Sequence, residues 1–104
     1  MRVTLENQDD IQKLRNVSMY AIFTTAAAET ARLMERIGLL AENCKEYGDA
    51  DGGEYLVVQL HSLGGLLATL KNAAAILAEK LTSEFGSIEA AYLYADNCKM
   101  IPVD

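Results

Sequence analysis

The residue with the widest chemical scope in this 104-residue sequence is His61, its only histidine. An imidazole changes charge near neutral pH and can serve as a nucleophile, a proton carrier or a metal ligand. Gly64 and Gly65 follow one turn later, inside a stretch whose spacing is helical. Each glycine costs a helix roughly 1 kcal/mol relative to alanine. Either a neighbouring helix approaches closely there, or the glycines clear space beside an exposed imidazole for another protein's active site.

The segment His61-Ser62-Leu63-Gly64-Gly65 resembles the His-x-Leu-Lys-Gly motif of histidine phosphotransfer domains, which are helical bundles of about this size. The resemblance implies that His61 accepts a phosphoryl group on a long helix. The Asp51-Gly52-Gly53 turn also stands about where that family begins its histidine helix. Gly64 occupies the position of the family's lysine, which helps to hold the phosphoryl group, and Lys71 is too far along the helix to replace it directly.

A second local resemblance, from His61 to Leu77, is to the phosphoacceptor helix of sensor kinases. In those proteins an acid usually follows the histidine and takes part in proton transfer, whereas Ser62 stands at that position here. The sequence holds no nucleotide-binding segment, which excludes an autonomous kinase. Phosphotransfer through His61 is therefore the single candidate activity.

Other catalytic and metal-binding patterns are missing from the sequence. It contains no Gly-x-Ser-x-Gly, P-loop or Rossmann motif, and no Glu-x-x-His for a di-metal bundle. Cys44 and Cys98 lie far apart and form no Cys-x-x-Cys pair, so we expect two reduced thiols. We expect no cofactor and no metal site, and apart from His61 no catalytic residue.

The charge distribution restricts the partners. With a net charge of -6 and scattered cations, the chain would be repelled by nucleic acid and by an anionic membrane surface. The acidic stretch 1–10 is unlike a signal peptide. We therefore expect a cytoplasmic location. Residues 55–70 are apolar enough to suggest a membrane span, but Gln59 and His61 interrupt them and Lys71 follows at once. We interpret this stretch as a buried helix.

The elements that position His61 are predicted by helical spacing in steps of three and four residues. One seam follows the helix expected to end at Gly48, and the other follows the helix that contains His61. Asp51 is expected to cap the second helix, with Glu54 in the capping-box position. The first seam comprises Met19, Phe23, Ala26, Thr30, Leu33, Ile37, Leu40, Cys44 and Tyr47; the second comprises Leu56, Leu60, Leu63, Leu67, Leu70, Ala74, Leu77 and Leu81.

Two short helices are expected at the ends of this antiparallel hairpin. Residues 8–15, capped by Asn7, would form the first, with a break at 16–18 because an unbroken helix to Tyr47 would be roughly 60 Å long, more than its partner can cover. Ser87 would cap the last helix after Gly86, and Pro102 would prevent its continuation. The expected fold is all-α: one domain over residues 1–104, a helical hairpin extended by short terminal helices to a four-helix bundle.

Second apolar stripes on both long helices need a cover. They comprise Ala27, Ala31, Met34 and Ala41 on the first helix and Val57, Leu66, Ala73 and Ile76 on the second. The terminal helices would cover part of them, and a second copy in a homodimer would cover the remainder. The sequence thus predicts a non-enzymatic protein of the adaptor, chaperone or inhibitor type, which acts through protein–protein contacts. The interface candidates are Tyr55, His61, Gly64, Gly65, Ala68, Lys71 and Ala75.

Overall fold

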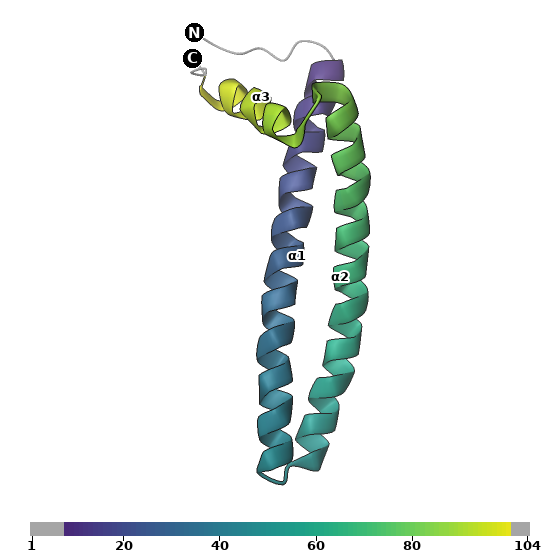
Figure 1. The fold of residues 1–104 in the computed structure, drawn as a ribbon, viewed down its shortest axis with the longest axis vertical. Coiled ribbons are helices and arrows are strands. Elements are labelled where there is room, and N and C mark those ends of the chain that lie inside the picture. The colour runs from purple at the N-terminus through teal and green to yellow at the C-terminus, as the bar shows by residue number, and fades with distance from the viewer. Residues whose placement is uncertain (1–7, 101–104) are drawn as a thin grey trace. The chain divides into compact units, whose positions relative to one another are not determined.

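The computed structural model describes residues 8–100, which contain three α-helices and no strand. Helix α1 spans Gln8–Glu46, α2 spans Ala50–Phe85 and α3 spans Ile88–Met100. Helices α1 and α2 run antiparallel as a hairpin, and α3 follows α2 (Figure 1). The all-α class and the hairpin are therefore confirmed. The cap expected at Asn7 and the stop expected at Pro102 lie outside the described residues.

The break expected at residues 16–18 is wrong, because α1 is one continuous helix of 39 residues. The amide of Asn16, which is 3% exposed, accepts a hydrogen bond from Gln12 Nε2 (2.9 Å) and donates one to Glu84 Oε1 (3.4 Å). The Ser18 hydroxyl donates to the Leu14 carbonyl within the same helix. Residues 8–100 therefore form three helices, where four were expected within the chain.

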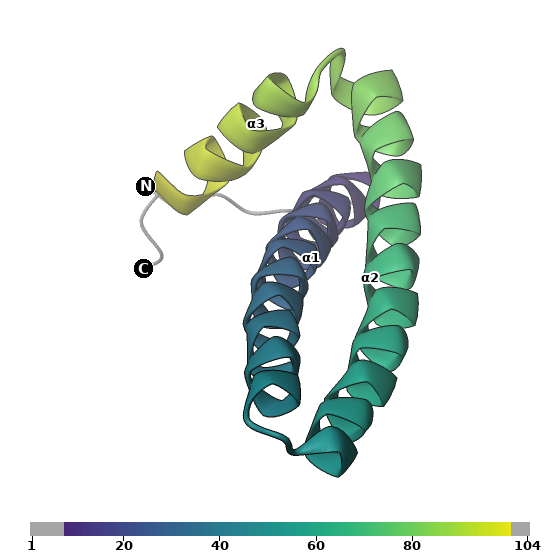
Figure 2. The same ribbon diagram turned by 60° about the horizontal axis from the view of Figure 1, so that its bottom comes forward.

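The reversal between α1 and α2 takes three residues (Figure 2). Gly48 has a φ of 81°, a left-handed conformation that favours glycine at a helix C-terminus. The Asp49 amide donates to the Cys44 carbonyl (2.7 Å) and the Gly48 amide donates to the Lys45 carbonyl (3.3 Å). These two bonds are the pair that defines a Schellman motif, so the C-cap predicted at Gly48 is confirmed.

The residue that caps α2 is Asp49, and the prediction of Asp51 is wrong. Asp49 Oδ1 accepts the Gly52 amide (3.0 Å), and the Asp49 carbonyl accepts the Gly53 amide (3.1 Å). Because Asp49 already ends the Schellman motif of α1, α2 begins two residues earlier than expected. The caps predicted for α3 are confirmed: Gly86 has a φ of 90°, and the Ser87 hydroxyl accepts the Ala90 amide (3.0 Å).

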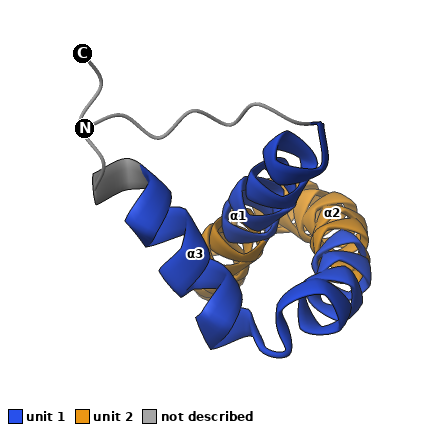
Figure 3. Ribbon diagram, turned by 90° about the horizontal axis from the view of Figure 1, so that it is seen from above, with its two compact units in different colours: residues 1–23, 73–104 blue, residues 24–72 orange. Residues whose placement is uncertain are grey.

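Contacts divide the chain into two compact units (Figure 3). Unit 1 comprises Met1–Phe23 and Ala73–Asp104, and unit 2 comprises Thr24–Asn72. Unit 1 holds a small core in which α3 packs against both long helices, with Tyr20 against Tyr92 (ring centroids 6.2 Å apart) and Phe85 against Tyr94 (5.1 Å). The buried residues of this core are Val17, Leu81, Ala91 and Ala95.

Unit 2 consists of the paired halves of α1 and α2 on either side of the turn. The α2 seam is confirmed along its whole length, since each of its eight residues is buried or half-buried. The α1 seam is partly wrong. Leu33 (46% exposed), Leu40 (52%) and Tyr47 (85%) lie largely in solvent, while Met34 and Ala41, expected on the second stripe, contact α2 instead.

The stretch 55–70 is not the buried helix that its composition favours. None of these residues is buried, and only 6% of the most apolar 18-residue window of α2 is buried. By length and composition α2 could cross a membrane; among the described helices it alone passes this test. The chain therefore exposes much more apolar helix surface than its sequence pattern suggests.

Candidate interaction surface

Six of the seven interface candidates are exposed. They are Tyr55, His61, Gly65, Ala68, Lys71 and Ala75, while Gly64 is half-buried. All seven lie on α2, with Ala75 in unit 1 and the rest in unit 2. At 100° per residue, His61, Gly64, Ala68, Lys71 and Ala75 share one side of this helix, which we call the small-residue flank.

Tyr55 does not share the small-residue flank. It lies about 140° around α2 from Ala68, given 3.6 residues per turn. Its ring, 65% exposed, cannot serve as the aromatic rim of the same contact. If Tyr55 anchors a partner, it does so on the side of α2 that carries Leu66.

The glycine pair is not required by the packing of α1 against α2. A Cβ built on Gly64 would lie 3.7 Å from Met34 Cε, an ordinary van der Waals contact, and one on Gly65 would meet nothing within 4 Å. Of the two explanations for the pair, close approach of the neighbouring helix within the chain is therefore wrong. The space beside His61 is open, as the second explanation requires.

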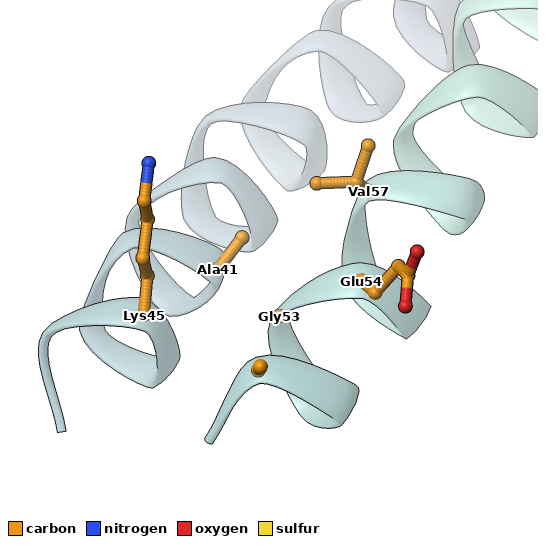
Figure 4. Close-up of a pocket in the computed structure, with 6 residues that line it drawn as sticks. Ala41, Lys45, Gly53, Glu54 and Val57 are labelled. Atoms are coloured by element: carbon orange, nitrogen blue, oxygen red, sulfur yellow. The ribbon is translucent and has the colours of Figure 1, made fainter. Parts of the chain in front are cut away.

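Two helical glycines of unit 2, Gly53 and Gly64, have a neighbour on the other helix. Of these, Gly53 marks the closer approach. A Cβ there would lie 3.4 Å from the Ala41 carbonyl oxygen and 3.6 Å from Cys44 Cβ. Beside it lies an open groove of about 410 Å³, which Figure 4 shows with Ala41 and Val57 pointing into the space between the helices. Lys45 and Glu54 stand at its two sides, one on each helix.

Both apolar and charged side chains lie beside the exposed leucines of α1. Leu33, Leu40 and Tyr47 follow one another at intervals of seven residues, and Ala26 begins the same series. We call Ala26, Leu33 and Leu40 the α1 stripe. A shallow hollow beside Leu33 is lined by Glu29, Arg32 and Arg36, and Arg32 Nη1 donates to Glu29 Oε1 at 2.8 Å.

One ionisable group departs clearly from its ordinary behaviour within residues 8–100. The pKa of Tyr94 is raised, first by burial against the core of unit 1 and then by the carboxylate of Asp10 and by Cys98. Its hydroxyl donates a hydrogen bond to the Cys98 side chain, which also favours the neutral phenol. Tyr94 thus belongs to the packing of α3 and not to the exposed surfaces of α2.

The described residues contain no group of three or more histidine, cysteine, aspartate or glutamate side chains that could hold a metal ion. Both cysteines are free and half-buried. A comparison with known proteins found no matching protein family, no similar curated protein and no similar solved structure. The surface of the hairpin itself is consequently the guide to function.

Sequence reasoning missed the α1 stripe as an exposed surface. It placed Leu33 and Leu40 against α2, because their three- and four-residue spacing fits an inward seam. The signal that distinguishes the two sides near the turn is size: Ala41 allows α2 to approach where Leu40 would hold it away. That signal was present in the sequence, but only the placement of α2 shows which side it selects.

Proposed function

We propose that this chain acts by binding another protein through the exposed helix faces of the hairpin. The observation that carries the proposal is the exposure of large apolar side chains along unit 2, chiefly Leu33, Leu40, Val58 and Leu66. Single exposed apolar residues are common on soluble proteins, whereas runs of them on neighbouring turns are typical of interaction sites. A four-helix bundle, which one chain does not form, is completed when the hairpin pairs with a helical partner.

The partner surface that suits these faces is an apolar helix. Helices pack by inserting side-chain ridges into the grooves of a neighbour, and the α1 stripe offers apolar side chains at intervals of two turns. The small-residue flank offers a second, closer contact through Gly64 and Ala68, with His61 and Lys71 as polar neighbours. An adaptor, a chaperone and an inhibitor would each use such faces.

The experiment compares substitutions on the two faces. A photoreactive residue at Leu40 or Ala68 captures the partner in the native cell, and mass spectrometry identifies it. Binding of that identified partner is then measured for Leu40→Asp, Ala68→Arg and the exposed control Ser83→Arg. We expect one face variant to lose at least roughly tenfold in affinity and the control to bind as wild type. All three keep their helicity, because each side chain is exposed.

Equal binding by both face variants and the control would contradict the proposal. Unfolding of Ala68→Arg, measured by circular dichroism, would show instead that the flank belongs to the core of the chain. These two outcomes separate a binding role from a purely structural one.

A second candidate is phosphotransfer through His61, and the observation that favours it is the exposure of this side chain beside the open space at Gly65. Transfer requires the imidazole nitrogen to reach the phosphoryl group of a donor protein. Incubation with a phosphorylated receiver domain or with acetyl phosphate would then leave acid-labile phosphate on the chain. His61→Gln should abolish that label while Ser62→Ala retains it. A wild-type chain that takes up no phosphate from either donor would eliminate this candidate.

A further inference from the structure

In the α1 stripe, Leu33 is 46% exposed and Leu40 is 52% exposed, while Ala26 is half-buried. Met34 and Ala41 lie on the side of α1 that faces α2: a Cβ built on Gly64 would lie 3.7 Å from Met34 Cε, and one built on Gly53 would lie 3.4 Å from the Ala41 carbonyl oxygen. The stripe lies about 100° around α1 from these two residues. All of residues 26–40 lie within unit 2, so the stripe belongs to one compact body.

The accessible surface of the chain is large for its mass. It amounts to 7400 Å², whereas a folded monomer of 11.3 kDa exposes about 5,700 Å². A stable interface needs only about 800 Å² from each partner. The surface of the chain is therefore large enough for a contact of ordinary size.

The α1 stripe is complementary to the same stripe of a second copy that runs antiparallel to it. Ala26 and Leu40 stand seven residues on either side of Leu33. In an antiparallel pair of α1 helices centred on Leu33, Ala26 faces the partner's Leu40, and Leu33 faces the partner's Leu33. A small residue opposite a large one fills space evenly, which is how antiparallel helices achieve close packing.

The charged residues beside the stripe obey the same symmetry. Glu29 and Arg36 each follow a stripe residue by three positions, so they line the same side of the helix. With the two-fold axis at Leu33, Glu29 and the partner's Arg36 are offset by one residue, about 1.5 Å along the helix axis, which these long side chains can span. A two-fold axis repeats the contact, which gives two cross-chain ion pairs of opposite charge. Charge complementarity of this kind fixes the register of a helix pair.

The local charge also distinguishes a second copy from other occupants. Residues 26–40 carry two acids, Glu29 and Glu35, and two bases, Arg32 and Arg36, so the net charge of -6 resides elsewhere in the chain. An anionic lipid surface would find no cationic excess to attract it. A second copy presents the same two acids and two bases in the reverse order, so opposite charges can meet.

We propose that a second copy of this chain covers the α1 stripe, with the two α1 helices antiparallel and a two-fold axis beside Leu33. The proposal rests on the proposed function and names its partner. The two hairpins together supply four long helices.

The first test is a charge exchange, measured by sedimentation equilibrium at several protein concentrations. Wild type is expected to have twice the 11.3 kDa mass of the chain. Glu29→Arg and Arg36→Glu each place like charges together twice in the dimer, so each should weaken dimerisation roughly tenfold or more. The double variant restores opposite charges and should regain most of the affinity. The Arg32–Glu29 bond within the chain is exposed, so circular dichroism should show unchanged helicity.

The second test fixes the register. With Cys44 and Cys98 replaced by serine, Leu33→Cys should form a disulfide-linked dimer under mild oxidation, because the two-fold axis brings residue 33 close to its own copy. Leu39→Cys is the matched control: Leu39 is also an exposed leucine of α1 but lies outside the stripe. We expect rapid cross-linking of the first variant and little of the second.

A wild-type chain that stays monomeric at all concentrations would overturn the proposal that a second copy is the partner. The proposed function would still stand if Leu40→Asp weakened binding of another protein captured in the cell. A dimer in which the charge-exchanged double variant is no better than the single ones would overturn the antiparallel register. Loss of all photocapture at Leu40 and Ala68, including capture of a second copy, would reject the proposed function itself.

Discussion

At the scale of single residues, the main finding is that the packing of α1 against α2 does not require glycine at either position of the pair in α2. Neither Gly64 nor Gly65 has a positive φ, and neither prevents a clash with α1. A residue that weakens a helix without serving its packing points to a requirement outside the chain. The pair adjoins His61 and Ala68, so that requirement falls on the small-residue flank.

Gly65→Ala should therefore stabilise the chain, raising the free energy of unfolding by about 0.5–1 kcal/mol through helix propensity. Urea denaturation followed by circular dichroism measures the change. Gly48→Ala is the matched control, because its left-handed backbone should make the same substitution destabilising by about 1 kcal/mol. Destabilisation by Gly65→Ala would mean that another helix already packs closely there.

Tyr94 links the packing of α3 to pH. Its pKa is raised in the folded chain above the value of 10.0 that applies in the unfolded chain. The folded state thus holds the phenolic proton more tightly, and the resulting stability is present below pH 10 and is lost as the pH rises through the folded pKa. Tyr94→Phe should lose less stability than wild type between pH 9 and pH 11, roughly the interval that spans the phenol's titration. Parallel pH dependences for the two chains would show that Tyr94 does not carry this effect.

At the scale of elements, the turn is defined by Asp49, which serves the last bonds of α1 and the first of α2. Asp49→Ala should reduce the free energy of unfolding by about 1 kcal/mol, the usual loss on removing an N-cap. Asp51→Ala removes a neighbouring carboxylate that makes no cap and should cost less than about 0.5 kcal/mol. Chemical denaturation of the two variants side by side decides, and an equal loss would assign the cap to both residues.

The two long helices differ in how well the sequence predicts them. The α2 seam was predictable because its leucines recur without interruption in steps of three and four residues. Helix α1 has apolar residues on two sides, so periodicity alone could not tell that Met34 and Ala41 turn inward while Leu33 and Leu40 remain exposed. The continuity of α1 depends on Asn16, whose partner Glu84 is 68 positions away, a contact that no local pattern reveals.

The candidate site, too, could be predicted only in part from the sequence. The sequence was sufficient to single out His61 and its glycines, because a lone histidine and a helical glycine pair are unusual. It could not establish their exposure, since a residue next to a seam is buried or exposed according to the tilt of the facing helix. The α1 stripe was hidden for the same reason.

At the scale of the whole molecule, the described core is small. Seven buried apolar residues are few for a chain of this length, and the four that form one cluster, together with their half-buried neighbours, lie in unit 1. Burial of apolar surface is the main favourable term in folding. In the dimer that we propose, the contact between copies should therefore supply much of the stability of unit 2.

Stability should accordingly depend on protein concentration. For a dimer of this size, a tenfold rise in concentration should raise the Tm by about 3 °C, because association draws the folded state away from the unfolded chain. Differential scanning calorimetry at several concentrations measures the shift, and Arg36→Glu should show a smaller one at a lower Tm. A Tm that is constant over a hundredfold range would contradict folding coupled to association.

The three-residue reversal at Gly48 has a consequence for the order in which the chain acquires its structure. Contacts such as that between Gly53 and Ala41 close a very short loop, whereas the bond between Asn16 and Glu84 closes one of 68 residues. The entropy lost on closure grows with loop length, so the hairpin should zip outward from its tip. Helix α3 would dock last, after the segments it joins have met. The leucines on α1 would then be exposed before α3 docks, so in the dimer that we propose the two copies should be able to associate before folding is complete.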